Sequence, residues 1–237
     1  MRFVVLLLMA AFLTACTTTE KKSQLASFYL PASRAVVLPV TSQQSGLDAL
    51  SQQLTASLKN DLAAHNYQVV AIDPEVYRHI TESALNATGS VYHPKLKQSL
   101  PLEPASYLRA VVEGLKRYYG FDVIFQSSIE LRDAEVKKGI ALWDNAKFPL
   151  EIVDKPKTAP IPLKAKGVSL KVSAYTSLGG TIHQVYQGMV VPYKILYQGS
   201  SLGQTQLTPA SSWPIDAKTI AKESLKSYYP KVKIAPQ

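Results

Sequence analysis

The stretch that decides the fold runs from residue 35 to residue 72 and reads AVVLPVTSQQSGLDALSQQLTASLKNDLAAHNYQVVAI. Its first six residues form a short apolar, β-branched run, which predicts a strand buried on both faces. Leucines then recur every three or four residues from Leu47 to Leu62, behind a capping pattern that begins at Ser45, and predict a helix with one apolar side. A second short strand is expected over residues 67–72. Strand, helix and strand in this order predict an α/β layer with some parallel pairing.

The same pattern continues beyond this stretch. Asp73 followed by Pro74 predicts a helix N-cap with proline at the first helical position. Residues 86–101 contain glycine and two prolines and predict a loop. A third helix is expected over residues 103–119, with Gly120 as its C-cap.

The second half of the chain changes period. Short runs rich in Val, Ile and aromatic residues alternate with turn residues, which predicts a meander of antiparallel hairpins that continues the sheet. The expected strands are residues 122–132, 139–143, 148–153, 168–175 and 181–192. A last helix is expected over residues 215–228. The predicted fold class is therefore α/β (α+β), with a mixed sheet, two or three packed helices, antiparallel hairpins in the second half and a C-terminal helix, all in one domain spanning residues 34–237.

The N-terminus indicates the compartment. Arg2 precedes an apolar run over residues 3–13, and Leu-Thr-Ala-Cys ends at Cys16. The run is too short to cross a hydrocarbon core of about 30 Å as a helix, so residues 1–15 are expected to be a secretory signal peptide. The tetrapeptide resembles the bacterial lipobox, in which the thiol receives a diacylglycerol and signal peptidase II cleaves just before it. The resemblance implies lipidation at Cys16 and a tether over residues 16–33; the alternative is an ordinary signal peptide with an incidental cysteine.

The residue after the lipobox indicates which of the two membranes would carry the lipoprotein. In the enterobacterial sorting pattern an Asp at that position retains a lipoprotein at the inner membrane, and Thr17 stands there in this chain. The resemblance therefore implies the outer membrane, with the domain on the periplasmic side. Cys16 is the single cysteine of the chain, so an intramolecular disulfide framework and a Cys-based metal cluster are excluded.

The charge balance points to an anionic partner. The 237 residues include 26 Lys and Arg against 17 Asp and Glu, which gives a formal net charge of +9. Nucleic acid and ATP are scarce in the periplasm, so no nucleic-acid partner is expected. The remaining candidates are lipopolysaccharide, phospholipid head groups, peptidoglycan carboxylates and an acidic face of an envelope protein. The alternative is that the basic surface only keeps the protein soluble.

Three features are candidate contacts for such a partner. In the last helix, lysines stand at four-residue spacing and form a basic stripe, whose alternative interpretation is a solvated helix face. Residues 154–166 interrupt the predicted meander with prolines and lysines, and a loop of this length favours a function. Tyr92 lies in the predicted loop before the third helix. The candidate contact residues are Lys218, Lys222, Lys226, Lys155, Lys157, Lys164, Lys166 and Tyr92.

No motif predicts catalysis, a metal or a cofactor. Residues 199–203 match the G-x-S-x-G nucleophile elbow in letters, but no histidine follows His183, so a turn is the better interpretation. Histidines 65, 79, 93 and 183 show no metal-ligand spacing.

Two other functions stay open. An envelope hydrolase acting on peptidoglycan or polysaccharide would need carboxylates that converge, and Asp133 could share a face with Glu130 or Glu135. A lipid or small-molecule carrier would need an enclosed apolar cavity.

The assembled pattern resembles a known group of proteins. Its components are the lipobox, the polar tether, the strand at 35–40, the leucine helix ending in NYQVV (66–70), the strand entry GFDVI (120–124) and the hairpin ALWD (141–144). Together these resemble small proteobacterial outer-membrane lipoproteins built on the α/β domain of the curli-secretion lipoprotein, the penicillin-binding-protein activator lipoproteins and the N-terminal domain of TolB. The similarity covers roughly residues 34–195. It implies a lipid-anchored periplasmic binding, assembly or activator module of the cell envelope, with no catalytic residue to carry over.

Overall fold

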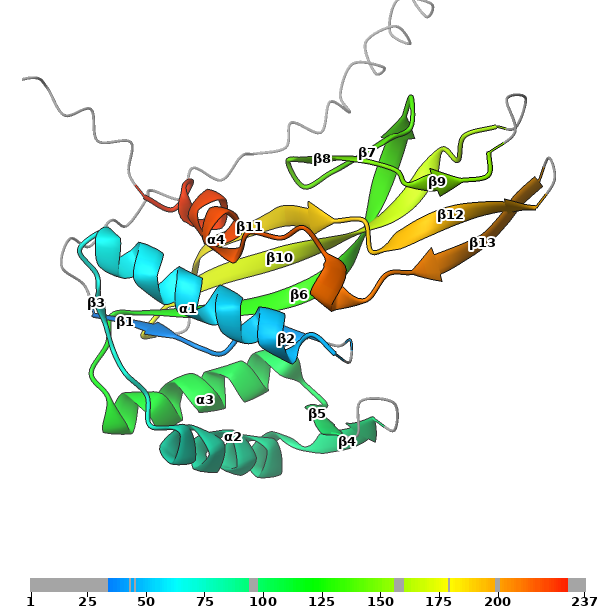
Figure 1. Ribbon diagram of the computed structural model, residues 1–237. Helices are drawn as coiled ribbons and strands as arrows, with labels where there is room; N and C mark the ends of the chain where they lie inside the picture. The colour runs from blue at the N-terminus through cyan, green and yellow to red at the C-terminus, as the bar shows by residue number, and fades with distance from the viewer. Residues whose placement is uncertain are drawn as a thin grey trace, which may run out of the picture.

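A central mixed sheet organises the molecule. The computed structural model describes residues 34–42, 44, 46–93, 98–155, 160–178, 180–198 and 201–229. The sheet has the order β11-β10-β6-β1-β3 (Figure 1). Its strands are β1 (Arg34–Val37), β3 (Gln68–Val69), β6 (Val123–Lys137), β10 (Lys164–Thr176) and β11 (Thr181–Val190). β1 is parallel to both β3 and β6, whereas β10 is antiparallel to both β6 and β11. The predicted α/β class with a mixed sheet is confirmed.

Short strands also pair with β6, one beside its middle and one at its far end. β2 (Thr41–Ser42) pairs with it in parallel, and β7 (Ile140–Trp143) followed by β8 (Ala146–Pro149) continues from its far end as antiparallel hairpins. The turn between β7 and β8 places Asp144 at φ 40° and Asn145 at φ 62°. Two consecutive residues with positive φ match the right-handed twist of the flanking strands. The sequence prediction of hairpins is confirmed here.

Two smaller sheets depart from the sequence prediction. β9 (Ile152–Val153), β12 (Tyr193–Gln198) and β13 (Ser201–Leu207) form a separate sheet in the order β13-β12-β9. The predicted strand over residues 148–153 is divided between β8 and β9, and β9 leaves the central sheet, so the prediction that all these hairpins continue one sheet is wrong there. The predicted meander ends at Pro192 and does not include β12 and β13. β4 (Ser90–His93) and β5 (Gln98–Pro101) form an antiparallel hairpin where a loop was expected.

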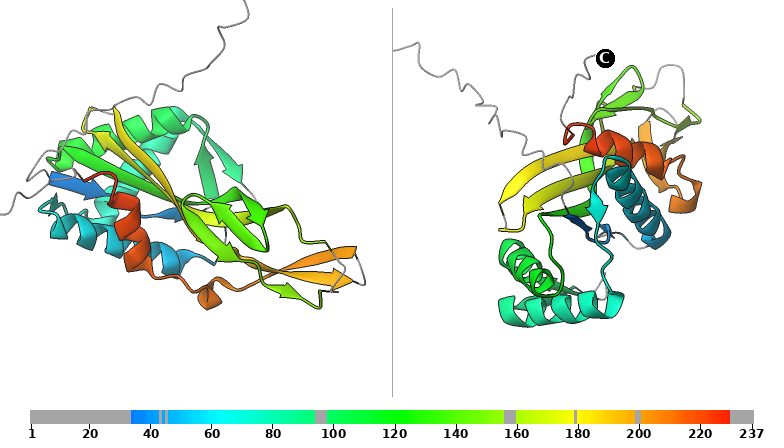
Figure 2. Two further views of the ribbon diagram at one scale, coloured as in Figure 1. Left: turned by 90° about the horizontal axis from the view of Figure 1, so that it is seen from above. Right: turned by 90° about the vertical axis from the view of Figure 1, so that its left-hand side faces the viewer.

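Two pairs of helices cover the two faces of the central sheet (Figures 1 and 2). α1 (Asp48–Ala64) and α4 (Ala217–Leu225) pack on one face, and α2 (Pro74–Thr88) and α3 (Pro104–Tyr118) pack on the other. A short 3-10 helix, η1 (Ala210–Ser212), precedes α4. The leucine stripe of α1 is confirmed, because Leu54, Leu58 and Leu62 are fully buried. Among the described residues, no helix is long and apolar enough to span a membrane.

The predicted helix ends are partly confirmed. Asp73 caps α2, and its carboxylate accepts hydrogen bonds from the backbone N–H groups of Glu75 and Val76. The capping pattern expected for α1 is wrong, because the helix begins at Asp48 with Leu47 as an N-cap that makes no side-chain bond; Ser45 lies outside the described residues.

The C-cap expected after the third helix is also misplaced. The cap residue of α3 is Tyr119 rather than Gly120. A Cβ at Gly120 would lie 2.6 Å from Nη1 of Arg34. The absence of a side chain at Gly120 therefore leaves room for the side chain of Arg34 at the start of β1.

Candidate functional site

The exposed side of α4 carries the lysine stripe predicted from the sequence. Asp216 starts this helix by accepting a hydrogen bond from the backbone N–H of Lys218 at 3.1 Å. Lys218, Lys222 and Lys226 are all exposed. Lys226 lies 3.2 Å from a carboxylate oxygen of Glu223. Within the described part of the chain, Lys218 and Lys222 form no ion pair. We call these three lysines the α4 lysine face.

The opposite side of α4 is fixed to the core. Ala221, Ser224 and Leu225 are completely buried, and the helix packs on α1, β10 and β11. The Ser224 hydroxyl donates to the carbonyl oxygen of Ile220 at 2.7 Å, so this buried polar group is satisfied. Burial of one side orients the lysines of the other side outward.

An aromatic cluster holds the segment that follows α4. Tyr229 stacks on His65 with ring centroids 3.6 Å apart, and its hydroxyl donates to Asp61 at 2.8 Å. The Tyr67 hydroxyl donates to that of Tyr228 at 3.4 Å. We call these five residues the aromatic clasp. Burial is the main cause that raises the pKa of both Tyr228 and Tyr229 above the ordinary range of a phenol. The sequence analysis did not find the clasp; the Tyr228-Tyr229 doublet was its only visible signal.

A half-buried histidine packs against the clasp. The ring of His183, in β11, packs edge-on against Tyr228 with centroids 5.4 Å apart. Its Nε2 atom is buried and makes no hydrogen bond to any described residue. Burial lowers the pKa of this imidazole, and a hydrogen bond with the backbone of Ser224 opposes that shift. Burial therefore favours the neutral form of this imidazole.

The lysines of the 154–166 insertion do not meet the α4 lysine face. Lys155 follows β9, and Lys164 and Lys166 stand in the first residues of β10 rather than in the predicted loop, toward the opposite end of the sheet (Figure 1). Lys164 and Lys166 are exposed, but Nζ of Lys166 is 2.6 Å from Oδ1 of Asp133. This contact lowers the pKa of the Asp133 carboxyl group. Lys155 is half-buried, and Lys157 lies outside the described residues.

Tyr92 lies on the β4–β5 hairpin. Its side chain is 60% exposed, and the neighbouring Val91 and Leu102 are 56% and 59% exposed. The hairpin continues from the α2–α3 layer, on the other face of the sheet from α4 (Figure 1). The structure thus separates the predicted contacts into three surfaces: the α4 lysine face, the insertion and the hairpin. Cys16 lies outside the described residues.

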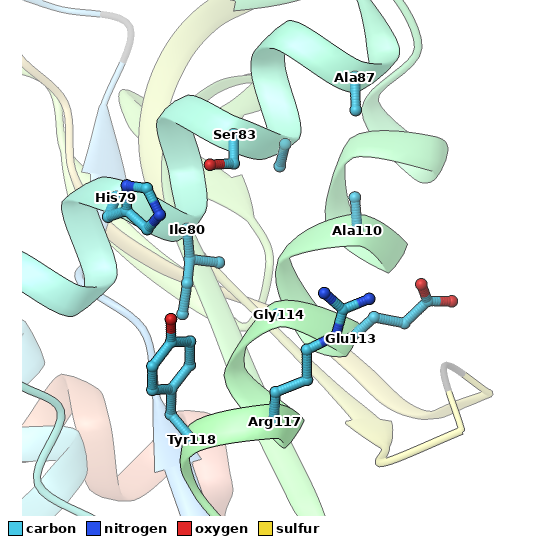
Figure 3. Close-up of a pocket in the computed structure, with 10 residues that line it drawn as sticks. His79, Ile80, Ser83, Ala87, Ala110, Glu113, Gly114, Arg117 and Tyr118 are labelled. Carbon is cyan, nitrogen blue, oxygen red and sulfur yellow. The ribbon is translucent and has the colours of Figure 1, made fainter.

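A groove of about 370 Å³ runs between α2 and α3. Its floor contains Ala87, Ala110 and Gly114, and its rim includes His79 and Arg117 (Figure 3). Small residues let the helices approach closely: a Cβ at Gly114 would lie 2.6 Å from Cγ2 of Ile80. The rim is charged and the groove is open at the surface, so it lacks the enclosed apolar form that a carrier requires.

A polar network joins the β7–β8 hairpin to the sheet. Nε1 of Trp143 donates to Oγ of Ser169 at 3.0 Å, and Ser169 donates to Asp144 at 2.7 Å. Arg132 pairs with the same carboxylate at 3.2 Å and lies over the ring of Tyr186, 4.2 Å from its centroid. Each charge and donor has a partner here, so the network stabilises the hairpin.

Of the two carboxylate pairs considered for hydrolysis, only Asp133 and Glu135 share a side of the sheet. Glu130 and Asp133 lie three positions apart in β6 and therefore face opposite sides of the sheet. Oε1 of Glu130 lies 3.7 Å from Nζ of Lys171. Glu135 shares the side of Asp133, and its Oε2 atom lies 3.1 Å from Nζ of Lys137. Among the described residues, no group of three His, Cys, Asp or Glu could hold a metal ion.

Comparisons with known proteins do not assign the chain to a family. No protein-family model matches the chain, and no curated protein matches it. Among solved structures, a hypothetical protein from Chlamydia trachomatis matches with 9% sequence identity and a TM-score of 0.33, over 66% of this chain and 71% of that one. A likeness at this level carries no argument about function.

Proposed function

We propose that this protein is a lipid-anchored, non-catalytic binding or assembly module of the bacterial cell envelope. In this proposal, acyl chains on Cys16 hold it at the outer membrane with its domain in the periplasm, and it contacts an anionic envelope component. The observation that carries the proposal is the α4 lysine face: three exposed lysines on one side of a helix whose other side is buried. A helix that presents exposed lysines, of which Lys218 and Lys222 form no ion pair with a described residue, attracts an anionic partner without any chemical step.

Tethering supplies the affinity that three lysines alone would not. Arg34, the first described residue, follows Cys16 by eighteen positions. Eighteen residues can span at most about 60 Å. Confinement within this distance of the membrane raises the local concentration of partners there, so individually weak contacts suffice.

Charge reversal tests the proposal. The variant Lys218→Glu/Lys222→Glu/Lys226→Glu should fold normally, because all three side chains are exposed. After gentle crosslinking in intact envelopes, this variant should lose the partners that copurify with the wild-type protein. A matched control, Lys116→Glu/Lys137→Glu/Lys138→Glu, changes the net charge equally at exposed positions away from α4 and should retain them. Unchanged copurification of the α4 variant would reject the lysine face as the contact surface.

A further inference from the structure

The position of the α4 lysine face relative to the start of the domain suggests what it contacts. β1 begins at Arg34, which pairs with Gln68 of β3. The neighbouring Tyr67 contacts Tyr228, just after α4. The chain therefore enters the domain at the end of the sheet where α4 ends (Figure 1). A tether attached at this end brings α4 close to the surface that holds the anchor.

The lysines form a flat, short cationic surface. Residues four apart on a helix are separated by about 6 Å along its axis, so Lys218 to Lys226 span about 12 Å. Of the acidic side chains on this helix, Asp216 is engaged with the helix N-terminus and with Thr219, and Glu223 contacts Lys226. Lys218 and Lys222 are left to meet external anions.

We propose that the α4 lysine face binds the anionic phospholipid head groups of the bilayer that carries the anchor. This inference rests on the proposed function, because it names the anionic component that the function requires. Three observations together favour a membrane surface. The lysines are complementary in charge to anionic head groups, eighteen positions separate Cys16 from Arg34, and Arg34 lies at the end of the sheet toward which α4 ends (Figure 1). In this orientation α1 and α4 lie toward the bilayer, and the α2–α3 layer lies on the side of the sheet away from it.

The insertion lysines fit this role less well. Lys166 is already paired with Asp133, and the insertion lies toward the end of the sheet away from Arg34 (Figures 1 and 2). When α4 contacts the bilayer, the end of the sheet away from Arg34 can contact a different partner.

Vesicle binding tests the inference. The chain from residue 16 onward, with Cys16→Ser so that acyl chains do not drive binding, is mixed with vesicles of phosphatidylethanolamine and phosphatidylglycerol. Neutral vesicles of phosphatidylethanolamine and phosphatidylcholine serve as the comparison. Binding should be detected on the anionic vesicles only and should weaken as ionic strength rises. Each lysine near an anionic bilayer contributes roughly fivefold in affinity, so Lys218→Gln/Lys222→Gln should weaken binding about 25-fold.

The control pair is Lys116→Gln/Lys138→Gln, which has the same net charge, with Lys116 on α3 beneath the other face of the sheet and Lys138 in the β6–β7 turn. It should bind within about twofold of the parent, since binding depends on local charge. Equal binding to neutral vesicles, or equal weakening by both pairs, would overturn the inference. If anionic vesicles are not bound while the charge-reversed α4 variant still loses its copurifying partners, the membrane assignment is wrong and the proposed function stands.

Discussion

The ring of His65 stacks on the ring of Tyr229 with the two planes only 11° apart, and Tyr229 also donates a hydrogen bond to Asp61. His65 follows the last residue of α1, and Tyr229 follows the end of α4. The pair therefore joins the ends of the two helices that share one face of the sheet. Together with the buried side of α4, it holds the helix in the position that turns the lysine face outward.

The first prediction concerns this contact. Tyr229→Phe removes the hydrogen bond to Asp61 but keeps the ring, and should lower the free energy of unfolding by about 1 kcal/mol. A double-mutant cycle with His65→Ala and Tyr229→Ala should give a coupling energy of about 0.5–1.5 kcal/mol. The two effects are not additive because either substitution alone already removes the contact between the stacked rings. Urea denaturation measures both. Strictly additive effects would show that the stack does not stabilise the fold.

The second prediction concerns the β7–β8 hairpin. A Cβ at Gly167 would lie 2.2 Å from the indole ring of Trp143, which is buried over β10. Gly167→Ala should therefore destabilise the protein by about 2 kcal/mol, since the ring must shift in a packed core. Gly180→Ala is the control, because the nearest atom there is 3.4 Å away. Thermal unfolding of both variants checks the difference, and equal stability would mean that Trp143 moves freely.

The third prediction concerns pH. Burial lowers the pKa of His183 in the folded protein, so below pH about 6.5 the unfolded chain binds a proton that the folded protein does not. Stability should fall as the pH drops from 7 toward the lower folded pKa, with a slope of at most about 1.4 kcal/mol per pH unit from this group.

His183→Phe keeps an aromatic ring beside Tyr228 and removes the titrating group, so the variant should lose this part of the acid sensitivity. Denaturant unfolding at several pH values measures it, with the exposed His79→Gln as the control. A pH dependence in His183→Phe identical to that of the wild type would show that another group is responsible.

Local signals in the sequence predicted local features correctly. The leucine spacing of α1 and the Asp73-Pro74 pair of α2 each act within a few residues, so the sequence pattern alone identified them. The α4 stripe is of the same kind, because Ala221 and Leu225 mark the buried side of the helix on which the lysines face outward.

Contacts between distant residues could not be predicted in this way. His65 and Tyr229 are 164 positions apart, and the β4–β5 hairpin depends on pairing too short to show a period. Gly167 reads as a turn residue in the sequence, yet it lies inside β10 and provides space for Trp143. These features follow from the tertiary packing of the sheet.

Intact-mass measurement of the protein purified from envelopes tests most directly whether Cys16 anchors this domain to a membrane. We predict a chain that begins at Cys16 and carries a diacylglycerol together with a further fatty acid, and a Cys16→Ser variant without this mass. An unmodified Cys16, or a chain that keeps residues 1–15, would contradict the account.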